Sequence, residues 1–206
     1  MQHYAYQRRI PVASKNRRIY DQGCNIINML PGIEDCSYLE LGVRDNINFE
    51  AIKCKTQMSV DINGKAKYTG TTDEYFTQTN IPNYDIIFID ANHDKEFVVR
   101  DYNNSIEYAT KWVLIHDMIP PKKKHATSDR CSDSFRVLHY MMSNTNIELY
   151  PMDENLGLTL IKMPATKIKL DNASTNLTYE LFKSFITNKK VYSRTEITKI
   201  LRNSNV

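Results

Sequence analysis

Short apolar runs alternate along this chain with longer amphipathic stretches, and this alternation constrains the fold more than any other feature of the sequence. Two of the runs, IIFI at 86–89 and WVLI at 112–115, are apolar at every position. A strand with one face in water alternates apolar and polar residues, whereas a strand covered on both faces is apolar throughout. We therefore predict that these two runs are central strands of a parallel sheet. Parallel neighbours need crossover connections, so helices should cover both faces.

The same criteria predict further strands and helices. The expected strands span Ser37–Val43, Gln57–Ile62, Tyr84–Asp90, Lys111–His116, Ile147–Tyr150 and Leu158–Met163. The expected helices span Asn25–Leu30, Asp45–Lys53, Thr72–Gln78, Asp94–Ala109 and Ser132–Ser143. No helix fits between the last two strands, so we expect them to form an antiparallel hairpin at one edge. The fold class that follows is a doubly wound α/β sandwich.

Helical spacing predicts which side chains of the longer helices face the core. The helix expected at 72–78 begins with a capping-type residue, Thr72. In the helix at 94–109 the inward stripe is Phe97, Val98, Tyr102, Ile106 and Ala109. In the helix at 132–143 it is Phe135, Val137, Leu138 and Met141.

The chain divides into three parts. We expect residues 1–36 to form a basic, helical N-terminal segment that caps the site or lies on its substrate side. Residues 37–163 form the α/β core, and residues 164–206 form a helical C-terminal appendage. The appendage contains YELFKSFI and RTEITKILR, which read as two short helices that pack on the core or mediate formation of a homo-oligomer.

Composition narrows the function classes. The formal net charge is only +3, so general nucleic-acid binding is disfavoured, and only QRRI, KNRRI and PPKKKH (120–125) are locally basic. The four cysteines lack metal-ligand spacing, and the N-terminus lacks the apolar stretch of a signal peptide. No segment approaches the roughly 18 apolar residues of a membrane span. We expect a soluble, cytoplasmic protein that does not associate with membranes.

Chemically active side chains follow successive predicted strands at the point where each strand ends. In open α/β sheets, ligands bind beyond the carboxyl ends of the strands, so these side chains should converge on one site. A glycine at the first strand end lets the backbone approach a ligand, and an acidic residue one strand over suits ribose hydroxyls. The residues that we expect at these strand ends are Glu40, Gly42, Asp61, Asp90, His93, His116 and Asp117.

The ordered segments YLELGVRDN, SVDIN, TTDEYF, YDIIFIDANHD and VLIHD resemble the class I S-adenosylmethionine-dependent methyltransferases. The likeness is strongest to the branch of small-molecule and sugar O-methyltransferases with a D-x-x-H motif, and it runs from Tyr38 to Met163. The resemblance implies a mostly parallel, seven-stranded Rossmann-like sheet that ends in an antiparallel hairpin. It also implies S-adenosylmethionine as the cofactor.

The resemblance assigns residues to the parts of that cofactor. Glu40 and Gly42 would border the methionine part, with Asp90 nearby, and Asp61 would hold the ribose hydroxyls. Asp73 would lie near the adenine edge, although an acid at a helix N-terminus has a structural role as well.

The loop after Gly42 departs from the family pattern, because Val43-Arg44-Asp45-Asn46 lacks the usual second glycine. Asn tolerates a left-handed backbone better than most residues, so Asn46 can substitute in the turn. A dinucleotide cofactor would need G-x-G-x-x-G at this position, so NAD is disfavoured.

A hydroxyl acceptor must lose a proton, either to a general base or to a divalent metal that lowers its pKa. His93, three residues after Asp90, is our candidate base. The resemblance implies that, in metal-dependent relatives, the D-x-x-H motif supplies a carboxylate ligand for the metal and a general base. By this resemblance, Asp90, His116 and Asp117 would bind Mg²⁺ or Mn²⁺. His116 stands where such relatives have Glu, and imidazole suits Mn²⁺ better than Mg²⁺.

Three functions follow from these observations. The first is transfer of a methyl group from S-adenosylmethionine to a hydroxyl of a small molecule or sugar. The second is methylation of nucleic acid, for which the basic stretches are the only support. The third is a catalytically silent module that binds the cofactor, or nothing, and serves in interactions through its C-terminal helices.

Overall fold

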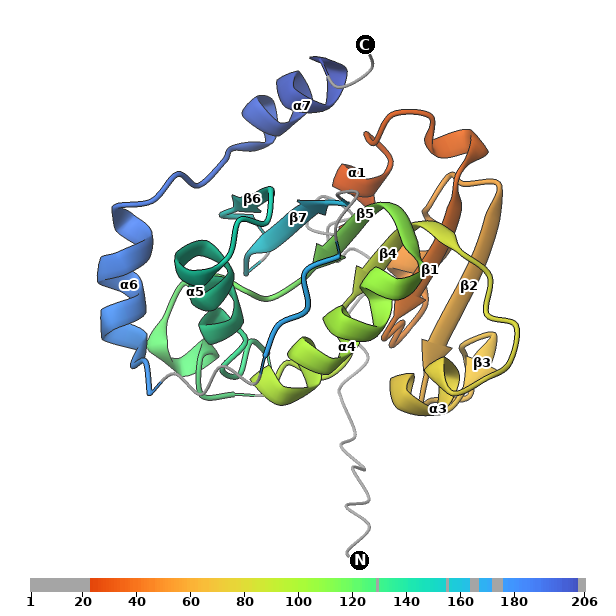
Figure 1. Ribbon diagram of the computed structural model, residues 1–206, viewed down its shortest axis with the longest axis horizontal. Coiled ribbons are helices and arrows are strands. Elements are labelled where there is room, and N and C mark those ends of the chain that lie inside the picture. Colours follow the sequence, from red (N-terminus) through yellow and green to blue (C-terminus); the bar gives the residue numbers. More distant parts are fainter. Residues whose placement is uncertain (1–22, 129, 155, 164–166, 172–175, 204–206) are drawn as a thin grey trace, which may run out of the picture.

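The computed structural model describes residues 23–128, 130–154, 156–163, 167–171 and 176–203. The part of the chain it describes forms a seven-stranded sheet in the order β3-β2-β1-β4-β5-β7-β6 (Figure 1). The strands are β1 (Ser37–Leu41), β2 (Thr56–Asp61), β3 (Tyr68–Thr69), β4 (Tyr84–Ile89), β5 (Ala109–Ile115), β6 (Leu149–Met152) and β7 (Leu158–Lys162). The helices are α1 (Cys24–Ile27), α2 (Ile47–Glu50), α3 (Thr72–Phe76), α4 (Lys95–Tyr108), α5 (Phe135–Asn144), α6 (Tyr179–Thr187) and α7 (Arg194–Asn203). Two short 3-10 turns, η2 (Ile33–Asp35) and η3 (Lys123–His125), complete the described elements.

The sheet has the predicted topology. Strands β3, β2, β1, β4 and β5 are parallel to their neighbours, and β7 and β6 form the antiparallel hairpin. The strand boundaries agree with the sequence pattern to within about two residues. β3 carried no apolar run and escaped prediction, because it contributes only Tyr68 and Thr69 to the sheet.

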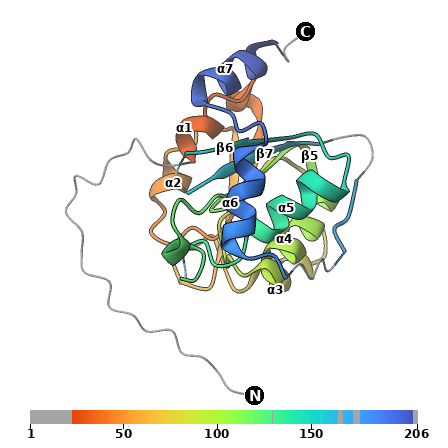
Figure 2. The same cartoon turned by 90° about the vertical axis from the view of Figure 1, so that its left-hand side faces the viewer.

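The side chains of the fully apolar runs pack into two separate hydrophobic cores, one on each face of the sheet. Ile87 and Ile89 of β4 face the core beneath α4, α5 and α6. Ile86 and Phe88 of the same strand face the second core, beneath α1 and α7. Figure 2 shows α1 and α2 on one side of the sheet and α4 and α5 on the other. The doubly wound sandwich is therefore confirmed.

The C-terminal segment packs on the core across the β6 edge of the sheet (Figure 1). Phe182 and Ile186 of α6 are buried in the first core, and Ile197 and Leu201 of α7 are buried in the second. Between the two helices, the backbone N–H of Tyr192 donates to Pro151 O of the edge strand at 2.8 Å. This contact covers part of an edge that would otherwise present unpaired backbone groups. A role for the two helices in self-association stays a prediction.

The helix predicted over Asp45–Lys53 is shorter than expected, because α2 spans only Ile47–Glu50. Ala109, predicted for the inward stripe of α4, is instead the first residue of β5. Two further helix predictions also need correction. Phe97 is 38% exposed instead of facing the core, and Asp101 is buried in its place, where it accepts a hydrogen bond from Thr72 Oγ1 at 2.6 Å. The cap of α3 is Thr71 and not Thr72, because Thr71 forms a capping box with Glu74. The inward stripe of α5, from Phe135 to Met141, is confirmed.

Candidate active site

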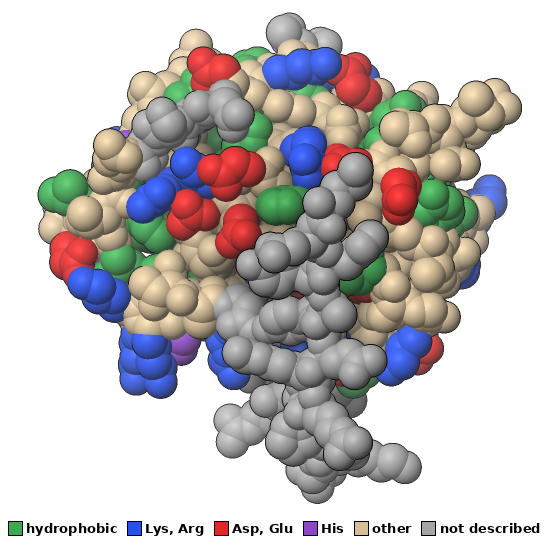
Figure 3. Space-filling view, turned by 90° about the horizontal axis from the view of Figure 1, so that it is seen from below, with side chains coloured by type: hydrophobic (Ala, Val, Ile, Leu, Met, Phe, Trp, Pro, Cys, Tyr) green, Lys and Arg blue, Asp and Glu red, His purple; other side chains and the backbone are tan. Residues whose placement is uncertain are grey.

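The candidate site lies beyond the carboxyl ends of β4 and β5. Hydrogen bonding continues past both strands, because Asp90 N donates to Leu41 O at 2.8 Å and His116 N donates to Ile89 O at 3.0 Å. Asp90 and His116 are thereby held side by side, with Asp117 next in the chain. Figure 3 shows this end of the molecule, where acidic (red) and basic (blue) side chains of the described residues are interspersed.

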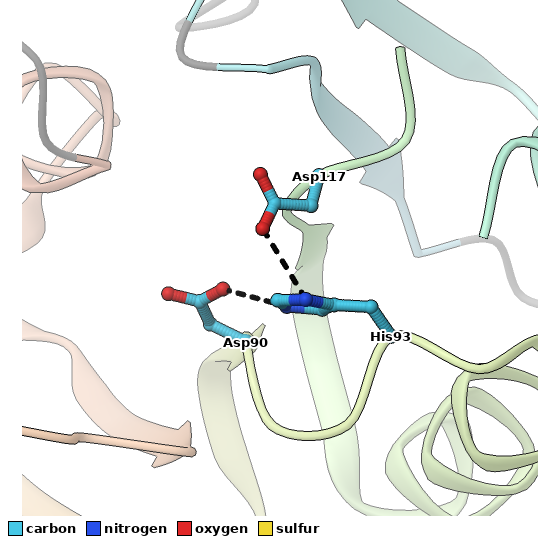
Figure 4. Close-up of side chains that lie close together, drawn as sticks. All are labelled: Asp90, His93 and Asp117. Atoms are coloured by element: carbon cyan, nitrogen blue, oxygen red, sulfur yellow. Dashed lines mark hydrogen bonds and ion pairs between the residues drawn. The ribbon is translucent and has the colours of Figure 1, made fainter. Parts of the chain in front are cut away.

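His93 links the two carboxylates (Figure 4). It comes from the loop between β4 and α4, and its side chain is 14% exposed. Its Nε2 lies 3.2 Å from Asp90 Oδ1, and its Nδ1 lies 3.3 Å from Asp117 Oδ2. Both nitrogens of one imidazole therefore face acidic oxygens that different strands supply.

His116 joins the same cluster from the end of β5. Its Nδ1 lies 3.0 Å from Asp90 Oδ1 and 3.5 Å from Asp117 Oδ1. The structure thus brings together all four residues that the sequence predicted for the catalytic and metal roles. The assignment of those roles stays a prediction.

Burial and mutual charge set the protonation of this cluster. Burial raises the pKa of Asp90, but the charges and hydrogen bonds of His116 and His93 outweigh it and hold that pKa below its usual range. Burial also raises the pKa of Asp117 to about 6, although the charges of His116 and His93 oppose the rise. The pKa of His93 is lowered by burial, but the hydrogen bond and charge of Asp90, with the charge of Asp117, raise it overall. The two carboxylates therefore favour the protonated form of His93.

Three of these groups have the spacing of a cation site. One ligand atom each from Asp90, His93 and Asp117 lies within 4.8 Å of the others. Asp117 Oδ1 is buried and accepts no hydrogen bond from the described residues. The group contains His93, whereas the sequence suggested His116 as the imidazole ligand.

Glu40 lies beneath this cluster and not on its surface. Glu40 is 1% exposed, and its Oε2 accepts hydrogen bonds from Tyr38 Oη at 2.6 Å and Asn48 Nδ2 at 3.0 Å. Burial raises the pKa of Glu40 to about 8, although these two hydrogen bonds oppose the rise. Asn48 also accepts from Cys24 N at 2.6 Å, so Glu40 connects β1 to α2 and α1.

Gly42 is required by the protein's own backbone. It has φ +88°, and a Cβ built on it would lie 2.3 Å from Asp90 O. The absence of a side chain at Gly42 therefore lets the end of β1 pass next to the residue that opens the D-x-x-H loop. The sequence analysis attributed this glycine only to the close approach of a ligand to the backbone.

Asp61 fastens the loop that follows Gly42. Its Oδ2 accepts from the backbone N–H groups of Val43 at 2.8 Å and Arg44 at 2.9 Å. Asn46 takes the left-handed conformation, with φ 66°, as the sequence suggested. Arg44 also has a positive φ, of 50°. The loop thus forms the predicted turn without its second glycine.

Asp73 lies apart from the cluster. It belongs to the first turn of α3, after the edge strand β3, which β2 and β1 separate from β4. Its Oδ2 forms an ion pair with Arg100 Nη2 of α4 at 2.9 Å. Its predicted contact with an adenine ring stays untested.

Sequence reasoning missed several residues that support the site. Ser134 Oγ donates to Asp117 O at 2.6 Å, and Gly157 O accepts from Met118 N at 3.0 Å. Neither residue belongs to a motif, and each is far from Asp117 in the chain. Only the pairing of β7 with β5 brings Gly157 to this position.

Comparison with known proteins defines the fold. No protein-family model matches the chain, and no curated protein is similar enough to match it. Among solved structures, cofactor-bound Rv0187 from MTB is 16% identical, with a TM-score of 0.54 over 75% of this chain and 83% of that chain. The O-methyltransferase from Bacillus cereus in complex with SAH is 10% identical, with a TM-score of 0.51 over 68% of this chain and 78% of that chain. TomG from Streptomyces achromogenes, an O-methyltransferase in complex with SAM, is 10% identical, with a TM-score of 0.51 over 69% and 78%.

These similarities show that the chain has the Rossmann-like fold found in O-methyltransferases. Among the described residues, no helix is both long enough and apolar enough to cross a membrane.

Proposed function

We propose that this protein transfers a methyl group from S-adenosylmethionine to a hydroxyl of a small molecule or sugar, with His93 as the general base. The observation that carries the proposal is the convergence of Asp90, His93 and Asp117 at the carboxyl ends of β4 and β5. Ligands bind at this end of open α/β sheets, and the fold is one that O-methyltransferases share.

The proposed cofactor site lies beside this cluster, at the ends of β1 and β2. Asp61 supplies a carboxylate for ribose hydroxyls, and the next residue, Ile62, is 74% exposed, which makes it an apolar surface for the adenine ring. When bound, S-adenosylmethionine supplies a methyl group that is already activated by its sulfonium. The protein's main contribution is then to align the acceptor with that methyl group.

His93 is placed to take the proton of the acceptor hydroxyl. A general base needs one free ring nitrogen within reach of that proton, so His93 must release one of its two carboxylate contacts. The carboxylate that keeps its contact, Asp90 or Asp117, then orients the ring, and the charges of both carboxylates stabilise the imidazolium that forms.

A divalent cation fits the same carboxylates. Asp90 and Asp117 would hold it, with an imidazole from His93 or His116 as a further ligand, and such a donor set suits Mn²⁺ better than Mg²⁺. A bound cation lowers the pKa of a hydroxyl attached to it. If a bound cation neutralised the charge of the two carboxylates, the pKa of His93 would fall, and a larger fraction of the imidazole would be unprotonated and able to accept a proton.

The proposal is tested by methyl transfer to a panel of hydroxyl compounds, with release of S-adenosylhomocysteine as the signal. His93→Gln should reduce transfer by about 10²–10⁴-fold, the usual contribution of a general base, and leave cofactor affinity unchanged. The control is the matched variant His139→Gln, because His139 of α5 packs edge-on against Phe185 of α6, away from the cluster. Equal transfer by the wild type and His93→Gln would remove His93 from the reaction.

One observation favours the catalytically silent alternative. Asp61 already accepts three backbone hydrogen bonds, from Val43, Arg44 and Asn63, so its loop is satisfied without a ligand. Ribose hydroxyls would have to use the remaining lone pairs of the carboxylate. Titration with S-adenosylmethionine separates the two proposals. Retention on heparin that weakens with salt would instead favour the nucleic-acid alternative.

A further inference from the structure

Asp117 has a backbone conformation that residues other than glycine seldom adopt. Its φ is 60°, in the left-handed region, where a residue with a Cβ is strained. Such conformations persist only when the surrounding structure fixes them, and they cluster at functional sites. The question is therefore what holds Asp117 in this state.

Backbone hydrogen bonds hold the chain on both sides of Asp117. On the N-terminal side, His116 N donates to Ile89 O of β4. On the C-terminal side, Met118 N donates to Gly157 O at 3.0 Å and Ile119 N donates to Leu156 O at 2.8 Å. The turn between β6 and β7 thus receives the two N–H groups that follow Asp117.

Ser134 fixes the carbonyl of Asp117 itself. Its Oγ donates to Asp117 O at 2.6 Å, and Ser134 is 0% exposed. A buried hydrogen bond of this kind sets the rotation of the peptide plane after Asp117, because a buried carbonyl without a partner is costly.

Gly157 allows this arrangement because it has no side chain. Its φ is +97°, and a Cβ built on it would lie 2.2 Å from Ile119 N and 2.8 Å from Ile119 Cα. Both are backbone atoms, so no side-chain rotation can relieve the overlap. A larger residue at 157 must move the segment that carries Asp117.

The turn is also fastened from outside the sheet. Gly157 N donates to Glu154 O at 2.8 Å, and Glu154 Oε2 accepts from Arg194 Nη2 at 2.7 Å and Arg194 Nε at 3.0 Å. Arg194 is the first residue of α7, so the C-terminal segment restrains the same turn.

We propose that Gly157 and Ser134 are positioning residues that hold Asp117 in its left-handed conformation and thereby set its carboxylate against His93. That Asp117 serves catalysis or cation binding rests on the proposed function. That these two residues place the carboxylate rests on the contacts above alone.

The test uses the full chain without added ligand. The imidazole ¹⁵N resonances of His93 are recorded at one fixed pH for the wild type, Gly157→Ala and Ser134→Ala, and Asp117→Asn shows the shift that accompanies loss of the carboxylate charge. Gly32→Ala is the matched control for glycine, because Gly32 has φ +64° with nothing within 4 Å of an added Cβ. Ser105→Ala is the control for serine, because Ser105 is equally buried and its Oγ has no partner among the described residues.

We expect Gly157→Ala and Ser134→Ala to move the His93 resonances in the direction of Asp117→Asn, and the two controls to leave them in place. With Mn²⁺ as the probe, both variants should weaken binding by about 10–100-fold, as loss of an outer support of a metal ligand does. Folded variants that keep the wild-type His93 resonances would overturn the proposal. If Gly157→Ala does not fold, the His93 resonances of Ser134→Ala alone test the proposal.

Failure of the proposed function has a different signature. In that case the wild type would bind neither S-adenosylmethionine nor Mn²⁺, while the His93 resonances would still respond to the two variants.

Discussion

His93 Nδ1 lies 3.3 Å from Asp117 Oδ2, although the two residues come from loops that follow different strands. The contact exists because β4 and β5 are parallel neighbours whose carboxyl ends meet. The contact therefore links His93, the proposed general base, to Asp117, the carboxylate that we propose the β6–β7 turn positions.

The first prediction concerns the charge of His93. Asp117→Asn removes a negative neighbour that favours the imidazolium, so the pKa of His93 should fall. NMR titration of the His93 ring measures the change. Asp73→Asn is the control, because Asp73 pairs with Arg100 away from the cluster. An unchanged pKa in Asp117→Asn would mean that the two side chains do not interact in solution.

The second prediction concerns cations. Mn²⁺ should raise the thermal stability of the wild type, by about 2.7 kcal/mol when its concentration is 100 times Kd, and Asp117→Asn should abolish the effect. The stabilisation should fade as the pH drops through about 6, because Asp117 then takes up a proton in competition with the cation. Stabilisation that survives in Asp90→Asn and Asp117→Asn would place the cation elsewhere.

The third prediction concerns Asp101, which is 1% exposed and whose pKa burial raises to about 7. Because an unfolded Asp titrates near 3.9, the folded state binds the extra proton between these two pH values, and stability falls as pH rises through that window. Asp101→Asn removes this loss. As the pH rises from 4 to 8, its free energy of unfolding should therefore increase by about 2–4 kcal/mol relative to that of the wild type.

Urea unfolding at several pH values provides the measurement for Asp101. Asp35→Asn, at an exposed position, should show no such trend. Parallel stability curves for the wild type and Asp101→Asn would contradict the assignment.

The fourth prediction concerns Gly42. An added methyl group meets the backbone of Asp90 at a positive φ, so Gly42→Ala should destabilise the fold by about 2–4 kcal/mol. Gly64→Ala is the control, because nothing lies within 4 Å of its added Cβ. Chemical unfolding of both variants gives the comparison. Equal stabilities would show that the β1–β4 approach is looser than described.

The sequence predicted the layers and the strand ends well, and the reason is physical. A run such as IIFI fits a strand that is covered on both faces, since its successive apolar side chains point to opposite faces of the sheet. Asp90, His93, His116 and Asp117 were found because parallel strands deliver their last residues to one edge. Gly157 and Ser134 left no such signal, because their role depends on backbone contacts between distant segments. Tyr68–Thr69 was missed because two residues show no periodicity.

The account depends most on cofactor binding at the ends of β1 and β2, and calorimetric titration of the full chain with S-adenosylmethionine tests it directly. We predict one site per chain with a Kd between about 1 µM and 1 mM, the range in which the KM values of enzymes usually lie. Asp61→Ala should weaken binding at least about tenfold, since it removes the charged acceptor proposed for the ribose, while Asp35→Asn leaves it unchanged. No binding heat at a concentration of about 1 mM, or equal binding by Asp61→Ala, would contradict the account.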